Sequence, residues 1–176
     1  DMASVPFQFN WENGVGPGGT GNSLAQLGGE VLVGGTFTVA GTTTALRVAR
    51  WSGTAWASLG SGSANGTNGS VDALVTAGNE VYAFGPFNSA GGGIANAAAR
   101  WNAGGWATLG SGTGNGFARN VSAVAWFNGA LHVGGSFTAA GPVTANYIAR
   151  WNGSAWSALG SGLDRLVDDI VADNNA

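Results

Sequence analysis

Short apolar runs alternate with glycine- and asparagine-rich turns along the chain, and no segment has a sustained apolar period of 3.6 residues. The first run of each set is followed by a two-residue turn (Gly28-Gly29, Gly78-Asn79 or Asn128-Gly129) and then by a second run. Such dipeptides are typical of type I′ turns, which join the strands of a β-hairpin. The pattern predicts hairpins of Leu24–Leu27 with Glu30–Val33, Val71–Ala77 with Glu80–Phe84, and Val121–Phe127 with Ala130–Val133.

Two further apolar runs follow each predicted hairpin. A glycine-rich connection leads to a third run ending in Ala-Arg-Trp, and a four-residue loop leads to a short fourth run that begins with tryptophan. Their content of β-branched and aromatic residues indicates strands. The third runs are Leu46–Trp51, Asn96–Trp101 and Asn146–Trp151, and the fourth begin at Trp56, Trp106 and Trp156.

The four runs recur with a period of 50 residues. Ala49-Arg50-Trp51 returns at 99–101 and 149–151, and thirteen positions are identical in all three copies. Four short antiparallel strands in about 40–50 residues are typical of one β-propeller blade. We therefore expect an all-β chain of four-stranded antiparallel blades, with three complete units and partial strands at both ends.

The period also sets the expected boundaries. Loops between blades are predicted at Gly60–Ser70, Gly110–Asn120 and Gly160–Gly162. The chain divides into an N-terminal segment (1–21), blade 1 (22–62), blade 2 (63–112), blade 3 (113–162) and the start of a further blade (163–176).

A known repeat resembles this pattern. Val33–Gly41, then Ala49-Arg50-Trp51, then Trp56-x-x-Leu59-Gly60-Ser61-Gly62 are similar to the kelch-like repeats of large secreted bacterial proteins, over about residues 22–173. The resemblance implies blades and secretion but no particular activity, because such repeats occur in enzymes, adhesins and scaffolds. In the second copy Phe84 replaces the first glycine of the doublet, which indicates that backbone geometry does not require glycine there.

Three blades do not close a propeller, which typically needs four to eight. An open arc would expose faces and strand edges made for burial, and its two cut faces would fit each other head to tail. We expect a homo-oligomeric ring or a filament, with a piece of a longer chain as the alternative. The residues expected to contribute are Phe7, Phe9 and Trp11 at one end, and Val167, Ile170 and Val171 at the other.

Composition restricts the chemistry. Cysteine and lysine are absent, histidine occurs once, and the net charge is −3. These counts exclude disulfides, thiolate sites and most catalytic triads, and they give no electrostatic basis for nucleic-acid binding. No run approaches the roughly 18 apolar residues of a membrane-spanning helix. We expect an extracellular protein, secreted or on the cell surface, with no cofactor and no metal.

The repeated Arg-Trp pairs are the most informative side chains. Three of the six arginines share one column, and we expect them to cap carbonyl groups or to stack on tryptophan; a ring of charge that binds an anion is the alternative. The paired tryptophans are expected in the blade cores, with exposed platforms for sugar rings as the alternative. These residues are Arg50, Trp51, Trp56, Arg100, Trp101, Trp106, Arg150, Trp151 and Trp156.

The other candidates for chemistry have simpler interpretations. His132 shares a column with Leu32 and Tyr82, so we expect a structural strand position. Glu30 and Glu80 share a column next to a hairpin turn, where we expect solvation rather than paired acid catalysis. The acids at 164, 168, 169 and 173 lack the spacing of a calcium loop. No catalytic residue is expected.

The sequence thus predicts a non-catalytic extracellular structural or adhesive module that associates with itself. A glycan-binding propeller that uses pockets between blades or exposed tryptophans is one alternative. An amyloid-like extracellular fibre is another, favoured by low charge and by a high content of Asn, Gly and Ala. Of the alternatives, an enzyme is the least favoured.

Overall fold

The computed structural model of the chain describes residues 19–110, 116–117 and 120–172. These residues form three four-stranded antiparallel sheets, and no α-helix occurs among them. We call the segments β1–β6, β7–β12 and β13–β18 units 1, 2 and 3. The sheet strands are β1 (Gly21–Leu27), β2 (Glu30–Gly35), β5 (Val48–Trp51) and β6 (Trp56–Ser58); β7 (Ala73–Ala77), β8 (Glu80–Phe84), β11 (Ala98–Asn102) and β12 (Gly105–Thr108); β13 (Val121–Phe127), β14 (Ala130–Gly135), β17 (Ile148–Trp151) and β18 (Trp156–Ala158).

The predicted hairpins are confirmed in register. Leu27 pairs with Glu30 across the Gly28-Gly29 turn, and the equivalent pairs close the first hairpins of the other two units. The two tryptophans of each unit face each other across the loop between the third and fourth strands, as in Trp51 and Trp56. The expected all-β class, antiparallel pairing and repetition are therefore confirmed, and three sheets of four strands match the three predicted units.

The connection between the second and third strands contains structure that the sequence did not predict. In each unit it folds into a two-stranded hairpin: β3 (Val39–Ala40) with β4 (Thr43–Thr44), β9 (Ser89–Ala90) with β10 (Gly93–Ile94), and β15 (Ala139–Ala140) with β16 (Val143–Thr144). The third strands accordingly begin at residues 48, 98 and 148, two residues later than expected. A residue in left-handed conformation precedes each of them: Arg47 (φ 66°), Ala97 (φ 57°) and Tyr147 (φ 66°).

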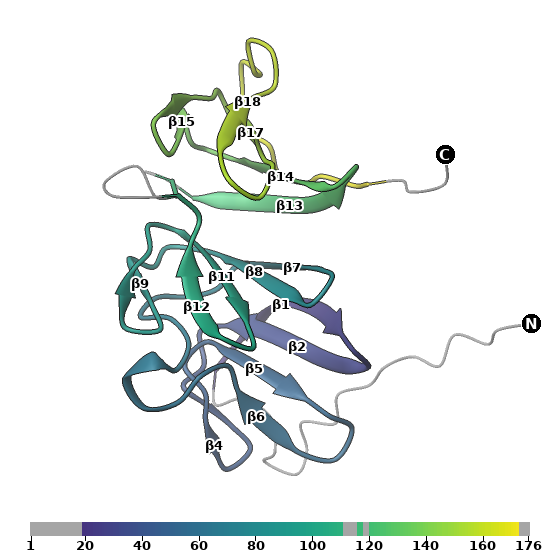
Figure 1. The fold of residues 1–176 in the computed structure, drawn as a ribbon, viewed down its shortest axis with the longest axis vertical. Helices are drawn as coiled ribbons and strands as arrows, with labels where there is room; N and C mark the ends of the chain where they lie inside the picture. The colour runs from purple at the N-terminus through teal and green to yellow at the C-terminus, as the bar shows by residue number, and fades with distance from the viewer. Residues whose placement is uncertain (1–18, 111–115, 118–119, 173–176) are drawn as a thin grey trace, which may run out of the picture.

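The three sheets follow one another along the long axis of the molecule, with the first strand of each unit next to that of its neighbour (Figure 1). Side chains join β1 to β7. The Ser23 hydroxyl accepts the amide of Leu74 at 2.9 Å, and the Thr76 hydroxyl donates to the carbonyl of Gln26 at 2.9 Å. Within each sheet the four strands are hydrogen-bonded in chain order, so the first strand lies in this shared row and the fourth lies farthest from it.

Most of the apolar core lies between units rather than within them. One cluster joins units 1 and 2 and includes Leu32, Leu59, Val71 and Leu74; a second joins units 2 and 3. Close approach explains the glycine doublet of β2, because a Cβ on Gly34 would lie 2.6 Å from Cγ1 of Val71 in the next unit. The φ angle of Gly34 is not in the left-handed region, so packing rather than backbone geometry excludes a side chain there.

The loop from unit 1 to unit 2 is ordered by backbone contacts with both units. The amide of Thr67 donates to the carbonyl of Leu46 at 3.1 Å, and the amide of Gly91 donates to the carbonyl of Gly66 at 2.8 Å. The side chain of Asn65, which is 7% exposed, donates to the carbonyl of Thr44 at 2.8 Å. Phe117 takes the place of Thr67 in the next loop, where its amide donates to the carbonyl of Asn96 at 2.8 Å.

Candidate functional site

The repeated arginines lie in the third strands, each opposite the middle of the second strand of its unit. Arg50 is in register with Leu32, Arg100 with Tyr82, and Arg150 with His132. Nη1 of Arg50 lies 3.2 Å from Oε2 of Glu30, and Nη1 of Arg100 lies 2.7 Å from Oε1 of Glu80.

The sequence did not predict this pairing. The guanidinium groups of Arg50 and Arg100 each pair with a carboxylate of the second strand. The two glutamates are not simply solvated either, since their side chains are 29% and 28% exposed. In the third unit Ala130 occupies the glutamate position, and Arg150 is exposed. Each pair at this exposure contributes at most about 1 kcal/mol to stability.

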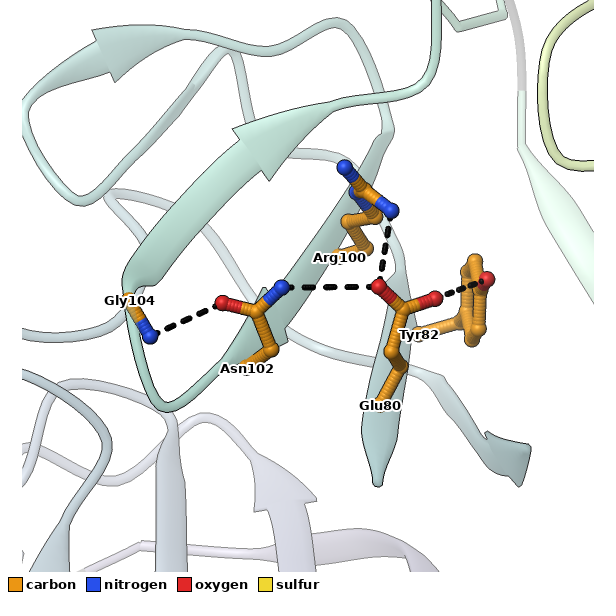
Figure 2. A network of polar contacts seen from close by, with 5 residues as sticks. All are labelled: Glu80, Tyr82, Arg100, Asn102 and Gly104. Atoms are coloured by element: carbon orange, nitrogen blue, oxygen red, sulfur yellow. Dashed lines mark hydrogen bonds and ion pairs between the residues drawn. The ribbon is translucent and has the colours of Figure 1, made fainter. Parts of the chain in front are cut away.

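Glu80 is the centre of a larger network in unit 2 (Figure 2). Its Oε2 accepts the hydroxyl of Tyr82 at 2.6 Å, and its Oε1 accepts Nη1 of Arg100 at 2.7 Å and Nδ2 of Asn102 at 3.4 Å. Asn102 in turn accepts the amide of Gly104 at 2.9 Å, which fixes the loop between β11 and β12. The network therefore connects the second strand, the third strand and the following loop.

Burial and the network make the Tyr82 phenol a weaker acid than an ordinary phenol. Burial, and then the hydrogen bond to the Glu80 carboxylate, raise the pKa of Tyr82 to about 12. In a Y147F variant, in which Tyr82 is the only tyrosine, we expect ultraviolet titration to give a pKa near this value and Glu80→Gln to lower it. Because the folded-state pKa is raised, the contribution of this group to stability is present below pH 10 and is lost as the pH rises toward 12. A phenol that titrates with its ordinary pKa would show that the network is absent.

A groove of about 450 Å³ opens between units 1 and 2 beside this network. Unit 1 contributes Leu27, at the end of its first hairpin, and Arg50. Unit 2 contributes Glu80 with the loop between β11 and β12, and Trp101 at the base of that loop. The full lining is Leu27, Arg50, Asn79, Glu80, Trp101, Asn102, Ala103 and Gly104. Both charged side chains already have a partner of opposite charge within their own unit, so the groove has no net charge.

The repeated tryptophans differ in burial along the chain. Trp151 and Trp156 are each 5% exposed and lie 5.1 Å apart between ring centroids, whereas Trp51, Trp56, Trp101 and Trp106 are only half-buried. Nε1 of Trp106 donates to the carbonyl of Leu59, and Nε1 of Trp156 donates to that of Leu109. The fourth-strand tryptophan of units 2 and 3 thus connects its unit to the preceding one.

His132 lies at a half-buried strand position, and its ring centroid is 6.0 Å from that of Phe127. Burial, and then the charge of Arg150, lower its pKa below 6.5. Because the folded-state pKa is lowered, the stability that depends on neutral His132 is present above about pH 6.5 and is lost as the pH falls below it. We expect this dependence to disappear in His132→Leu, which places the residue of unit 1 in the same column. Urea denaturation of both proteins at several pH values measures the difference, and parallel curves would contradict the burial of His132.

Of the four acids near the C-terminus, the structure describes Asp164, Asp168 and Asp169, and Asp173 lies outside the described residues. Within residues 19–110, 116–117 and 120–172, no group of three or more His, Cys, Asp or Glu side chains is placed to hold a metal ion. Asp164, Asp168 and Asp169 are exposed. In the same part of the chain no helix has the length and apolar character needed to cross a bilayer.

The C-terminal segment 163–172 docks on unit 3 as the residues just before β7 dock on unit 1. The amide of Val167 donates to the carbonyl of Gly135 at 3.3 Å, and the amide of Val71 donates to that of Gly35 at 3.0 Å. Four residues earlier, the amide of Leu163 donates to the carbonyl of Asn146, as Thr67 does to Leu46. The segment therefore follows the repeat with four residues omitted from the preceding loop.

Side chains at the two ends of the array are exposed, whereas the side chains at equivalent positions inside the array are buried between units. Leu24 in β1 is 59% exposed, whereas its equivalent Leu74 is 6% exposed beneath unit 1. Leu163 is 48% exposed, whereas Thr67 and Phe117 at the equivalent position are 2% and 4% exposed. Val171 is 84% exposed, while Val167 and Ile170 pack toward Gly134. Phe7, Phe9 and Trp11 lie outside the described residues.

Comparison with known proteins adds no relative to this picture. A scan of the chain against protein-family models finds no match, and a search of curated proteins finds none.

Proposed function

We propose that the chain is a non-catalytic, extracellular structural or adhesive module of kelch-like propeller blades, which associates head to tail through its two incomplete ends. The observation that carries the proposal is the contrast in burial between the ends and the interior, with Leu24 59% exposed and its equivalent Leu74 6% exposed.

The arrangement of the units supports the blade assignment. The strands of each sheet lead away in chain order from a row formed by β1, β7 and β13. In a propeller the first strands line the central axis in this way, and each blade covers the face of the next. The residues that make contacts between neighbouring units resemble those of kelch-like repeats. Among them are the glycine doublet of β2 and the fourth-strand tryptophans.

The ends support association because they are unlike each other. One end presents Leu24 on the free face of β1. The other presents Leu163, Leu166 and Val171 on a segment that has no strand partner among the described residues. A contact between two different surfaces is heterologous, and it generates a ring if the rotation closes or a filament if it does not. The short hairpins of the described units already pair their strands internally, so no observation favours the amyloid-like alternative.

Charge substitution at each end tests the proposal. We expect Leu24→Glu alone and Val171→Glu alone to be monomers in size-exclusion chromatography with light scattering, because a buried, unpaired charge opposes the contact. A heterologous contact makes a further prediction for their mixture. Each variant keeps one intact end, so an equimolar mixture forms dimers of one copy of each and nothing larger.

Ile94→Glu is the matched control, because Ile94 is 72% exposed within unit 2, away from both ends. We expect this variant to assemble like the unmodified chain. Assembly by Leu24→Glu, or a mixture that stays monomeric although the unmodified chain assembles, would refute head-to-tail association. A monomeric unmodified chain would refute it as well.

A further inference from the structure

We infer that the groove between units 1 and 2 binds a neutral saccharide, with Trp101 and Leu27 against the apolar face of a sugar ring and with Glu80, Asn102 and Arg50 bonding its hydroxyl groups. This inference is independent of end-to-end association, because the groove lies within one chain.

The size and chemistry of the groove fit a small ligand. Its volume of about 450 Å³ is within the range of roughly 300–1,000 Å³ that small-molecule sites occupy. A half-buried tryptophan, a leucine and an alanine contribute apolar surface, and two asparagines, a glutamate and an arginine contribute hydrogen-bonding groups. A pyranose ring presents the complementary pattern, with C–H groups on one face and hydroxyl groups around its edge.

The paired charges disfavour a ligand that carries a net charge. Glu80 is paired with Arg100, and Arg50 is paired with Glu30, so the groove has no uncompensated charge. A carboxylate or phosphate ligand would meet Glu80, and a cation would meet Arg50. A hydroxyl group can both donate to a carboxylate and accept from a guanidinium group, so neighbouring hydroxyls satisfy both residues at once.

The polar groups are held in place before any ligand arrives. Tyr82, Arg100 and Asn102 fix the Glu80 carboxylate with bonds of 2.6, 2.7 and 3.4 Å. Asn102 also holds its own loop through Gly104 (Figure 2). Preorganised groups lose less entropy when a ligand binds, so a shallow site of this kind gains affinity.

The equivalent positions between units 2 and 3 lack the glutamate, the leucine and the accessible tryptophan of this groove. There the glutamate position is Ala130, the leucine position is Ala77, and Trp151 is 5% exposed. This position therefore offers neither the carboxylate nor an accessible ring face, and it supplies an internal control within the same protein.

The test is titration of the full chain with soluble neutral hexasaccharides of glucose, mannose, galactose, xylose and N-acetylglucosamine, followed by calorimetry and ligand-observed NMR. We expect at least one to bind. Ala103 is exposed at the mouth of the groove, and Ala103→Gln should weaken binding at least about tenfold, or 1.4 kcal/mol. Glu80→Gln should also weaken it, since the charged acceptor is lost.

Ala155→Gln is the matched control, because Ala155 is an exposed alanine of the corresponding loop in unit 3. It should leave binding unchanged. The Val171→Glu variant should also bind normally, which separates this inference from the association of the ends. Absence of binding to all five hexasaccharides would overturn the inference, as would equal weakening by Ala103→Gln and Ala155→Gln, or tighter binding of a charged saccharide such as a heparin hexasaccharide.

Discussion

Replacing Gly66 by alanine is expected to lower the free energy of unfolding by at least about 3 kcal/mol, among the larger effects of a single substitution. Gly66 has a φ of +63°, and a Cβ there would overlap the carbonyl oxygen of Leu46. That carbonyl accepts the amide of Thr67 and fixes the passage from unit 1 to unit 2. Gly116 (φ 84°) and Gly162 (φ 76°) meet the carbonyl groups of Asn96 and Asn146 in the same way, so the constraint belongs to the repeat.

Gly28→Ala is the control that separates backbone conformation from collision. Gly28 has a similar φ of +56°, but nothing lies within 4 Å of a Cβ built there. It should lose only the roughly 1–2 kcal/mol that a left-handed L-residue costs. Urea denaturation followed by circular dichroism measures both variants. Equal losses in the two would show that Gly66 does not approach the Leu46 carbonyl.

Replacing Trp156 by alanine should destabilise the chain by about 3–5 kcal/mol, as large-to-small changes of a buried aromatic do. The ring is 5% exposed, and it lies 4.7 Å from Phe117 and 5.1 Å from Trp151 between centroids. Its Nε1 donates to the carbonyl of Leu109 at 3.1 Å. The substitution therefore opens a cavity and also leaves a carbonyl of unit 2 without its donor.

Trp156→Phe isolates the second of these effects. It keeps most of the ring but removes the donor, so we expect a loss of about 1–3 kcal/mol. Thermal unfolding followed by circular dichroism gives both values without depending on tryptophan emission. A loss below about 1 kcal/mol for Trp156→Ala would contradict the packing of unit 3 on unit 2.

The strands could be predicted from the sequence because each depends on local signals. A turn dipeptide such as Gly28-Gly29 between two apolar runs indicates a hairpin, and the repeat presents the same pattern three times. The small hairpins were missed for a physical reason. β3 and β4 have only two residues each, too few for a detectable alternation, and their order depends on contacts with the rest of the unit.

Pockets between blades were one alternative from the sequence, but the place and lining of this groove were not predicted because they depend on packing between units. One signal was present, since Glu30 with Arg50 and Glu80 with Arg100 are each separated by 20 residues, and the third unit lacks the acid. That spacing could have indicated a cross-strand ion pair. Nothing in the sequence indicated that Trp101 would remain half-buried while its equivalent Trp151 is buried, because this difference depends on how neighbouring units cover each ring.

Sedimentation velocity of the unmodified chain over a range of micromolar concentrations tests the central claim most directly. If the exposed ends are complementary, the weight-average sedimentation coefficient increases with concentration toward that of a ring or a growing filament. A single boundary with the mass of one chain at every concentration would show that Leu24 and Val171 stay exposed to water, and it would contradict the account.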